Sequence, residues 1–404
     1  MPFLLSQLIE AARWMGALAV LTLHVNNMFV NQADIMSAPH APPAYVWWFF
    51  TGTAMGHQAV VGFFVLSGWL VGGGALARMA AGQAYLRDYF IHRFARVYVV
   101  LIPTLLLTLA LDSLGRVLFA DSGVYDWPTF KGHFSTGLFL AGLLNLQSLL
   151  VDTFGTNGPL WSLACEFWYY VAFPLLMLPF ARVYGFGWRA AGFSLGLALV
   201  AGLSSPANWF LFGFAIWAIG AFATRAPRPL IRGRWPSLAL LVAVIAAIRL
   251  VVRGPLLEAH PALGLAADLA AALSFANLLV VFRDAPQTGF AALRATLHKP
   301  LADFSFSLYA IHMPIVIFAR AFIGHVMGRD WATQLATGAN YAVAIAVAIL
   351  AVASAYGFSL LTEAKTGAAR RAIGAALDRM APPPLAVEAP PLPGGRTAAR
   401  NGEV

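Results

Sequence analysis

The most constraining feature of this sequence is a series of long apolar runs. A helix that spans a bilayer needs about 20 mostly apolar residues. Eleven runs of this kind occur, near residues 12–31, 47–76, 97–119, 134–151, 158–181, 190–203, 207–224, 237–252, 263–282, 302–325 and 338–361. Charged residues make up only 11% of the chain, against about 25% in an ordinary globular protein. The sequence therefore excludes a soluble fold and predicts an all-α, polytopic membrane protein.

The arginines and lysines indicate how the runs are oriented. Short cytoplasmic loops are enriched in these residues. The richest clusters are Arg78, Arg87, Arg93 and Arg96; Arg182 and Arg189; Arg225, Arg228, Arg232 and Arg234; Arg283, Arg294 and Lys299; and Lys365, Arg370 and Arg371. If all eleven runs crossed, the first cluster would lie on the side opposite the cluster that ends at Arg234. One run is therefore expected not to cross.

The run at 134–151 is the expected exception, because Gly137, Gly142, Asn145 and Gln147 interrupt it. Non-crossing backbone is tolerated at membrane depth where it is buried in protein. We therefore predict about ten transmembrane helices and one re-entrant segment, with both termini cytoplasmic.

The chain divides into three predicted parts. Residues 1–361 form a membrane-embedded domain, 362–380 a cytoplasmic surface helix, and 381–404 a disordered cytoplasmic tail rich in Pro and Gly. The single cysteine, Cys165, excludes an intramolecular disulfide and a cysteine-rich metal site, and is expected to pack in the core. The net charge of +9 is distributed over short loops, so we expect the lipid bilayer as a partner and no nucleic acid.

Four ionisable residues lie near the middle of predicted spans, namely His24, His57, Glu166 and His312. Such residues are costly in lipid, and they commonly mark functional sites. The ordinary alternative is a hydrogen bond between helices, and it applies most to His57, which has no polar neighbours on its own helix face. For Glu166 the alternative is a structural pair with an Arg or His. The four side chains are predicted to lie at similar depth and to converge on one site.

Three of the four lie on polar stripes. Arg13 and His24 are about three helical turns apart and share a face, which Asn27 continues. The other two stripes are Ser162, Glu166 and Tyr169 or Tyr170, beside Trp161, and Ser305, Tyr309 and His312. Arg93 and Arg96, at positions i and i+3, also share a face, and paired guanidinium groups bind phosphates well. Their alternative role is positive-inside anchoring.

These patterns together resemble integral-membrane acyltransferase family 3, whose bacterial members include polysaccharide O-acetyltransferases. The resemblance spans residues 10 to about 360. It rests on the Arg13–His24 spacing, the run Gly62-Phe63-Phe64-Val65-Leu66-Ser67-Gly68, Arg93-x-x-Arg96, Leu160-Trp161-Ser162-Leu163 with Glu166, and Ser305-Phe306-Ser307-Leu308-Tyr309 with His312. Many members have two adjacent carboxylates where this chain has Glu166 and Phe167.

The resemblance implies a multi-pass enzyme of the bacterial inner membrane. This enzyme would move an acyl group, with acetyl expected, from cytoplasmic acetyl-CoA to a hydroxyl of a sugar or glycan at or beyond the outer face. His24, Glu166 and His312 are the expected catalytic residues, and Arg13, Arg93 and Arg96 would bind the acyl-CoA. The expected acceptor contacts are Asn27, His57, Trp161, Ser162 and Tyr309, and no metal is expected.

Two other classes of protein remain open at this point. A proton-coupled transporter or a flippase of a lipid-linked sugar also uses buried His and Glu. Such a protein is expected to show two structural repeats, and the sequence has no such symmetry. A non-catalytic membrane scaffold is the third class. It does not explain why buried ionisable groups lie in polar stripes.

Overall fold

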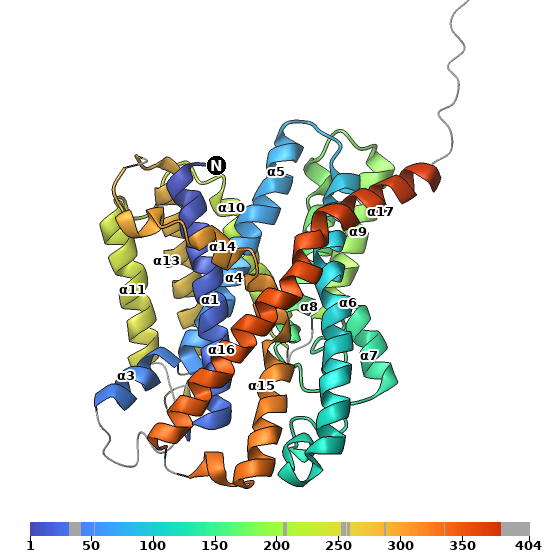
Figure 1. The fold of residues 1–404 in the computed structure, drawn as a ribbon. Helices are drawn as coiled ribbons and strands as arrows, with labels where there is room; N and C mark the ends of the chain where they lie inside the picture. Colours follow the sequence, from blue (N-terminus) through green and yellow to red (C-terminus); the bar gives the residue numbers. More distant parts are fainter. Residues whose placement is uncertain are drawn as a thin grey trace, which may run out of the picture.

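The computed structural model describes residues 1–31, 42–51, 53–204, 208–251, 256, 259–286, 288–334 and 336–380. The predicted tail at 381–404 lies outside the described residues. The described chain is a bundle of helices in which segments distant in sequence pack side by side (Figure 1). Helix α1 (Phe3–Phe29), for example, packs against α4 (Thr53–Ser67) and against α15 (Ser305–Met327).

Within the described part of the chain, eight helical stretches are long and apolar enough to cross a membrane. They are Phe3–Phe29, Pro42–Ala80, Leu86–Leu118, Leu160–Phe180, Phe186–Leu203, Ala262–Asp284, Ser305–Met327 and Gly338–Met380. The two other predicted spans form α10 (Phe210–Ala223), an apolar helix of 14 residues, and α11 (Arg234–Val251), of 18 residues. The prediction of an all-α polytopic membrane protein is therefore confirmed.

The segment predicted not to cross forms only a short helix. Helix α7 (Thr136–Leu143) has eight residues, about 12 Å of helix, and ends where Asn145 and Ser148 take positive φ values. Within the described residues, 144–159 contains no helix. Gln147 in this stretch is buried, and its side-chain amide donates to the Leu160 carbonyl oxygen at 3.2 Å. This hydrogen bond holds Gln147 against α8, as expected for the predicted re-entrant segment.

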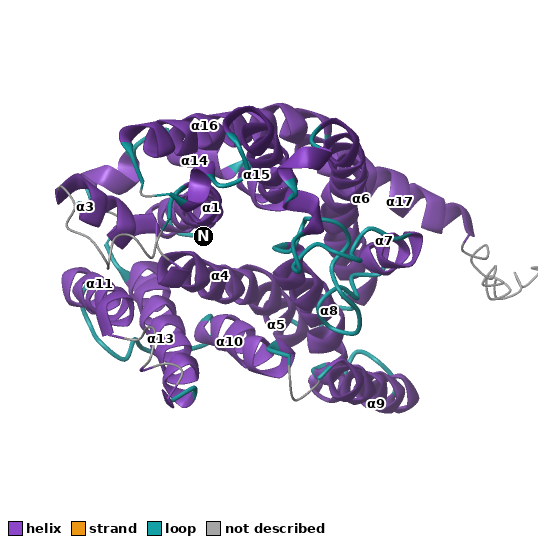
Figure 2. Cartoon of the chain, turned by 90° about the horizontal axis from the view of Figure 1, so that it is seen from below, coloured by secondary structure: helices purple, strands orange, loops and turns teal. Residues whose placement is uncertain are grey.

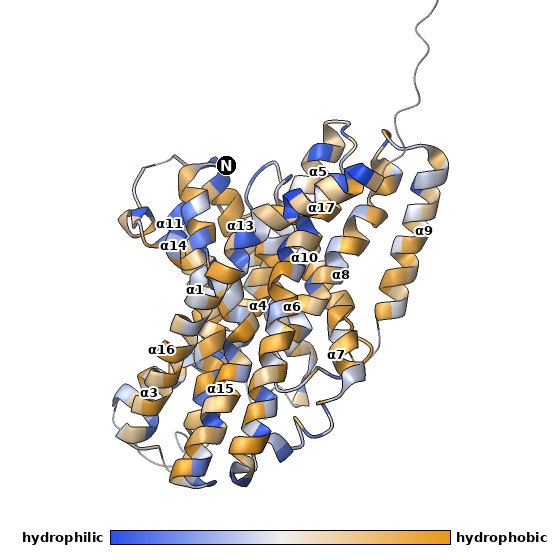
Figure 3. Ribbon diagram, turned by 45° about the vertical axis from the view of Figure 1, so that its right-hand side comes forward, coloured by the Kyte–Doolittle hydropathy of each residue, from blue (hydrophilic) through white to orange (hydrophobic). Residues whose placement is uncertain are grey.

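The central region of the bundle lies between α1, α4, α6 (Leu86–Leu118), α8 (Leu160–Leu176) and α15 (Figure 2). Helices α9 (Phe186–Leu203), α10, α11 and α13 (Ala262–Asp284) lie on one side of this region, and α16 (Gly338–Leu361) lies on the other (Figure 2). Polar residues gather toward the ends of the helices (Figure 3).

Helix α4 continues through one π-helical turn, η1 (Gly68–Gly72), into α5 (Gly73–Ala80). Glycine is required there because α10 approaches the backbone closely. A Cβ on Gly68 would lie 1.8 Å from the Trp217 carbonyl oxygen, and a Cβ on Gly220 would lie 2.1 Å from the Val65 carbonyl oxygen. Two backbones therefore meet where the sequence reads Leu66-Ser67-Gly68, and this close approach fixes the position of Ser67.

The short elements complete the chain. Helix α3 (Pro42–Thr51) precedes α4, α14 (His298–Ala302) precedes α15, and α17 (Thr366–Met380) follows α16. Helix α17 lies within the predicted surface helix at 362–380 and packs against α6. The N-terminus, the end of α5 and α17 lie at one end of the bundle, at the top of Figure 1.

Candidate active site

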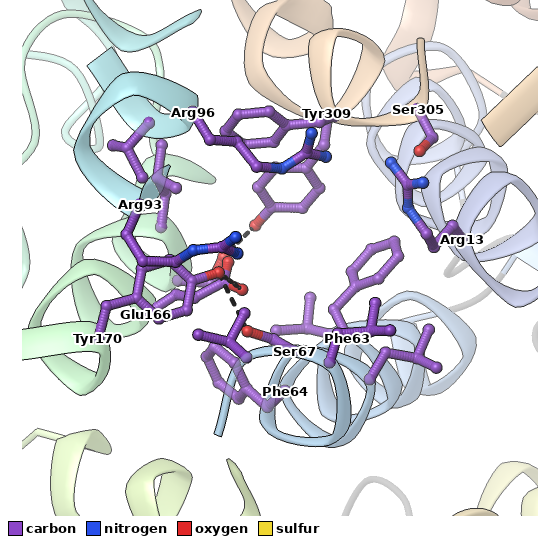
Figure 4. Close-up of a pocket in the computed structure, with 18 residues that line it drawn as sticks. Arg13, Phe63, Phe64, Ser67, Arg93, Arg96, Glu166, Tyr170, Ser305 and Tyr309 are labelled. Carbon is purple, nitrogen blue, oxygen red and sulfur yellow. Dashed lines mark hydrogen bonds between the residues drawn. The ribbon is translucent and has the colours of Figure 1, made fainter. Parts of the chain in front are cut away.

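A cavity of about 380 Å³ opens between α1, α4, α6, α8 and α15 (Figure 4). One wall is apolar and includes Val60, Phe63 and Phe64 of α4. The polar lining consists of Arg13, Ser67, Arg93, Arg96, Ser162, Glu166, Tyr170, Ser305 and Tyr309. The cavity is therefore a mixed pocket, with cations and one carboxylate facing an apolar wall, as is usual for sites that bind small molecules.

Three arginines reach this cavity from two helices. Arg13 comes from α1, and Arg93 and Arg96 come from successive turns of α6 (Figure 4). The Arg93 guanidinium lies 6.0 Å from the centre of the Tyr170 ring, and the Arg96 guanidinium lies 5.5 Å from the centre of the Phe306 ring. The structure thus brings together the three residues predicted to bind the donor.

A carboxylate that the sequence analysis did not identify holds two of these arginines. Glu363 follows α16 and is buried. Its Oε1 lies 3.3 Å from Arg96 Nη2 and 3.7 Å from Arg13 Nη2. Its Oε2 accepts hydrogen bonds from the backbone N–H and the hydroxyl of Ser307, both at 3.1 Å. The sequence feature that could have identified Glu363 is its position, since it is an acidic residue directly after the last apolar run.

Glu166 ends a chain of hydrogen bonds that crosses three helices. It accepts a hydrogen bond from the Tyr170 hydroxyl, one turn later on α8. The Ser67 hydroxyl lies 3.1 Å from the Tyr170 hydroxyl and itself accepts from Trp217 Nε1 at 2.9 Å. The close backbone approach at Gly68 thus sets the position of this carboxylate. The neighbouring Phe167 stacks on Phe94 of α6, with the two ring centres 5.5 Å apart.

His24 and His312 form a pair beside the cavity but are not part of its lining. Their ring centres are 5.1 Å apart. His312 is buried, and its Nδ1 donates to the Tyr309 carbonyl oxygen at 2.7 Å. Because Nδ1 carries the proton, Nε2 is left as an acceptor, and it has no partner among the described residues. The structure therefore brings the two histidines together. Glu166, in contrast, lines the cavity.

Tyr309 connects the histidine pair to the cavity. Its ring lines the cavity and lies 5.9 Å from the His312 ring and 5.9 Å from the Phe63 ring. Its hydroxyl donates to the Pro159 carbonyl oxygen at 2.8 Å and lies 2.5 Å from the Ser162 hydroxyl. Tyr309 and Ser162, both predicted acceptor contacts, thus form part of the wall nearest to the histidines.

The helix that carries His312 contains Pro314, which has no N–H to donate to the Ala310 carbonyl oxygen. The side-chain amide of Asn157 donates to this oxygen instead, at 3.0 Å, and it also lies 3.3 Å from the Thr108 hydroxyl. Asn157 is fully buried. The sequence analysis missed this residue because its partner lies 153 positions away.

The remaining predicted contacts lie apart from the cavity lining. His57 Nε2 lies 2.9 and 3.0 Å from the two carboxylate oxygens of Asp268 on α13, which also accepts from Gln58 at 2.8 Å. This matches the alternative interpretation, a hydrogen bond between helices. Trp161 packs on the rings of Phe64 and Trp209, and Asn27 is exposed one turn after His24.

The described residues contain no cluster of three or more His, Cys, Asp or Glu side chains arranged to hold a metal ion. Cys165, from the same turn of α8 as Glu166, is buried and is absent from the cavity lining.

The fold and the site define a polytopic membrane protein with a cationic cavity beside a pair of histidines, of which His312 is buried. Residues 7–360 match the family model described as an acyltransferase domain, so the chain belongs to integral-membrane acyltransferase family 3 and is an acyltransferase. The acyltransferase MdmB of Streptomyces mycarofaciens is 27% identical over 94% of this chain and 96% of its own length. No solved structure matches the chain.

Proposed function

We propose that this acyltransferase moves an acetyl group from cytoplasmic acetyl-CoA to a hydroxyl of a sugar or glycan at or beyond the outer face of a bacterial inner membrane. The observation that carries the proposal is the cavity in which Arg13, Arg93 and Arg96 face an apolar wall next to the His24–His312 pair. A CoA thioester is complementary to this cavity, because it has anionic phosphates at one end for the arginines and an uncharged acyl arm at the other for the apolar wall.

The three arginines are proposed to bind the donor phosphates. Guanidinium groups form strong, charge-assisted hydrogen bonds with phosphate oxygens. Arg93 has no carboxylate partner within ion-pair distance among the described residues, so its charge is available to a ligand. The Val60, Phe63 and Phe64 wall offers the acyl arm an apolar surface that leads toward Tyr309.

His24 is proposed as the general base. As the acceptor hydroxyl oxygen forms a bond to the thioester carbonyl carbon, His24 takes the hydroxyl proton. The carbon–sulfur bond then breaks, and the proton passes to the departing CoA thiolate. A positioned base typically contributes about 10²- to 10⁴-fold to such a reaction. His312, whose Nε2 has no partner among the described residues, can accept a hydrogen bond from His24 and hold its ring in place.

The test is acetyl transfer by purified protein in liposomes, scored beside acetyl-CoA binding. His24→Ala is expected to lower transfer about 10²- to 10⁴-fold and to leave donor binding nearly unchanged. His325→Ala is the matched control, because His325 lies at the far end of α15 and pairs with Asp121 at the surface. His24→Ala protein that keeps most of its transfer activity would remove this residue from the mechanism. Sugar movement without acetyl transfer would instead favour a transporter.

A further inference from the structure

A second, smaller groove adjoins the main cavity between η1, α5 and α6. Its volume is about 80 Å³, and it shares Leu70, Val71 and Arg93 with the main cavity. Its other lining residues include Arg78, Tyr89 and His92. Arg78 lies in the last turn of α5, at the end of the bundle where the N-terminus lies (Figure 1). The groove therefore extends the donor cavity toward the predicted cytoplasmic side.

The groove carries a surplus of positive charge. Among the described residues, neither Arg78 nor Arg93 has a carboxylate within ion-pair distance, although both line the groove. Asp88 and Arg370 also act electrostatically on His92, so one carboxylate and one further cation face the same region. Two unpaired guanidinium groups on either side of a small space favour an anionic ligand.

The Tyr89 side chain gives an independent indication of a ligand. The residue is only 6% exposed, and it lines the groove. Its hydroxyl has no hydrogen-bond partner among the described residues. Burying a hydroxyl without a partner is unfavourable. A phosphate oxygen bound in the groove would supply the missing acceptor.

We propose that this groove binds the 3′-phosphate at the nucleotide end of the CoA donor, with Arg78 and Tyr89 as its ligands. The inference rests on the proposed function. It assigns the two ends of one molecule to two connected spaces. Arg93 lies in both spaces and would contact the phosphates between the ends. A volume of 80 Å³ suits a phosphate group rather than a nucleoside, so the adenosine would lie at the mouth of the groove.

The first experiment measures the affinity of the purified full chain for acetyl-CoA and for acetyl-dephospho-CoA, which lacks only the 3′-phosphate. The wild-type protein is expected to bind acetyl-CoA about tenfold more tightly, in keeping with one charge-assisted hydrogen bond. Arg78→Gln is expected to remove this preference by weakening acetyl-CoA binding alone. Arg232→Gln is the control, because Arg232 is exposed and is not among the residues that line the groove.

Tyr89→Phe provides the second measurement. If the hydroxyl is a ligand, the variant binds acetyl-CoA several-fold more weakly, while its melting temperature without donor is unchanged or higher, because an unpaired buried hydroxyl is removed. Equal wild-type affinity for the two donors would overturn the inference and leave the proposed function intact. A loss of affinity in Arg78→Gln that is equal for both donors would also overturn it. Failure to bind either donor would contradict the proposed function itself.

Discussion

At the scale of single residues, Glu363 is the carboxylate that pairs with two of the three arginines in the cavity lining. One buried carboxylate lies within ion-pair distance of Arg13 and Arg96, which come from helices distant in sequence, and it also accepts two hydrogen bonds from Ser307. It therefore ties α1, α6 and α15 to the segment after α16. Removing one partner of a buried charge network leaves the other charges unsatisfied, which is usually destabilising.

Glu363→Gln is accordingly expected to lower the free energy of unfolding by about 1.5–3 kcal/mol, the range for hydrogen bonds to charged groups. The measurement is the melting temperature in detergent. Glu10→Gln is a suitable control, because Glu10 lies one turn before Arg13 on α1 and accepts a hydrogen bond from the Gln7 amide at 3.0 Å, but lies outside ion-pair distance of Arg13. An unchanged melting temperature in Glu363→Gln would show that the network does not stabilise the fold.

Arg93 and Arg96 lead to a prediction about the donor. Replacing both with Gln should weaken acetyl-CoA binding by about 1.5–3 kcal/mol for each hydrogen bond to phosphate that is removed. Equilibrium binding to purified protein measures this change, and Arg189→Gln, whose side chain bonds the Pro179 carbonyl oxygen, is the control. Donor affinity equal to that of the wild-type protein would restrict the two arginines to a role in membrane orientation.

Part of the site was predictable because local spacing predicts a shared helix face. Arg93 and Arg96 share such a face of α6, and both line the cavity. Contacts between helices were not predictable. Glu363, Asn157 and Asp268 find their partners 267, 153 and 211 positions away, and no local pattern records such pairs. The separation of Glu166 from the histidine pair likewise depends on how the helices rotate about their axes.

At the scale of elements, the close packing of η1 on α10 is the most restrictive feature. Hydropathy predicted a helix over 47–76, but it gave no sign that one turn within it is π-helical. Such turns are rare and often lie at functional sites. Here the turn follows Ser67, whose hydroxyl lies 3.1 Å from that of Tyr170, the residue that donates to Glu166.

Gly68→Ala should therefore destabilise the protein, because its Cβ would lie 1.8 Å from a backbone oxygen. We expect a loss of about 1–3 kcal/mol, as in other overpacked sites, together with lower transfer activity. Gly62→Ala, six residues earlier, is the control, because its nearest neighbour would be the Phe275 ring at 3.9 Å. Melting temperatures of the two variants in detergent make the comparison. A normal melting temperature for Gly68→Ala would contradict the close packing.

At the scale of the whole molecule, the arrangement of the helices is consistent with the predicted distribution of charge. The N-terminus, the end of α5 and α17 lie at one end of the bundle (Figure 1). The cationic loops that begin near Arg78 and Arg225 follow helices that end there. The positive-inside rule predicts that this end faces the cytoplasm.

Cysteine labelling can test this orientation, because the one native cysteine, Cys165, is buried and gives little background. Gln83→Cys and Arg232→Cys should react with a membrane-impermeant maleimide only after the cells are opened. Lys131→Cys, in the loop after α6, should react in intact cells. All three positions are exposed. Labelling of Arg232→Cys in intact cells would invalidate the ten-span topology.

The hydrogen bonds of Tyr309 have a consequence for how the protein can keep the two sides of a membrane separate. Under the proposed function the cavity opens to the cytoplasm, and it must not join water on the other side, because each charge that leaks across 100 mV releases about 2.3 kcal/mol. The Tyr309 hydroxyl is hydrogen-bonded to the Pro159 carbonyl oxygen and the Ser162 hydroxyl, and its ring contacts those of Phe63 and His312. The Tyr309 hydroxyl therefore needs no water molecule as a hydrogen-bond partner. In the proposed mechanism, an uncharged acyl group would therefore pass beside Tyr309 without opening a path for ions or protons.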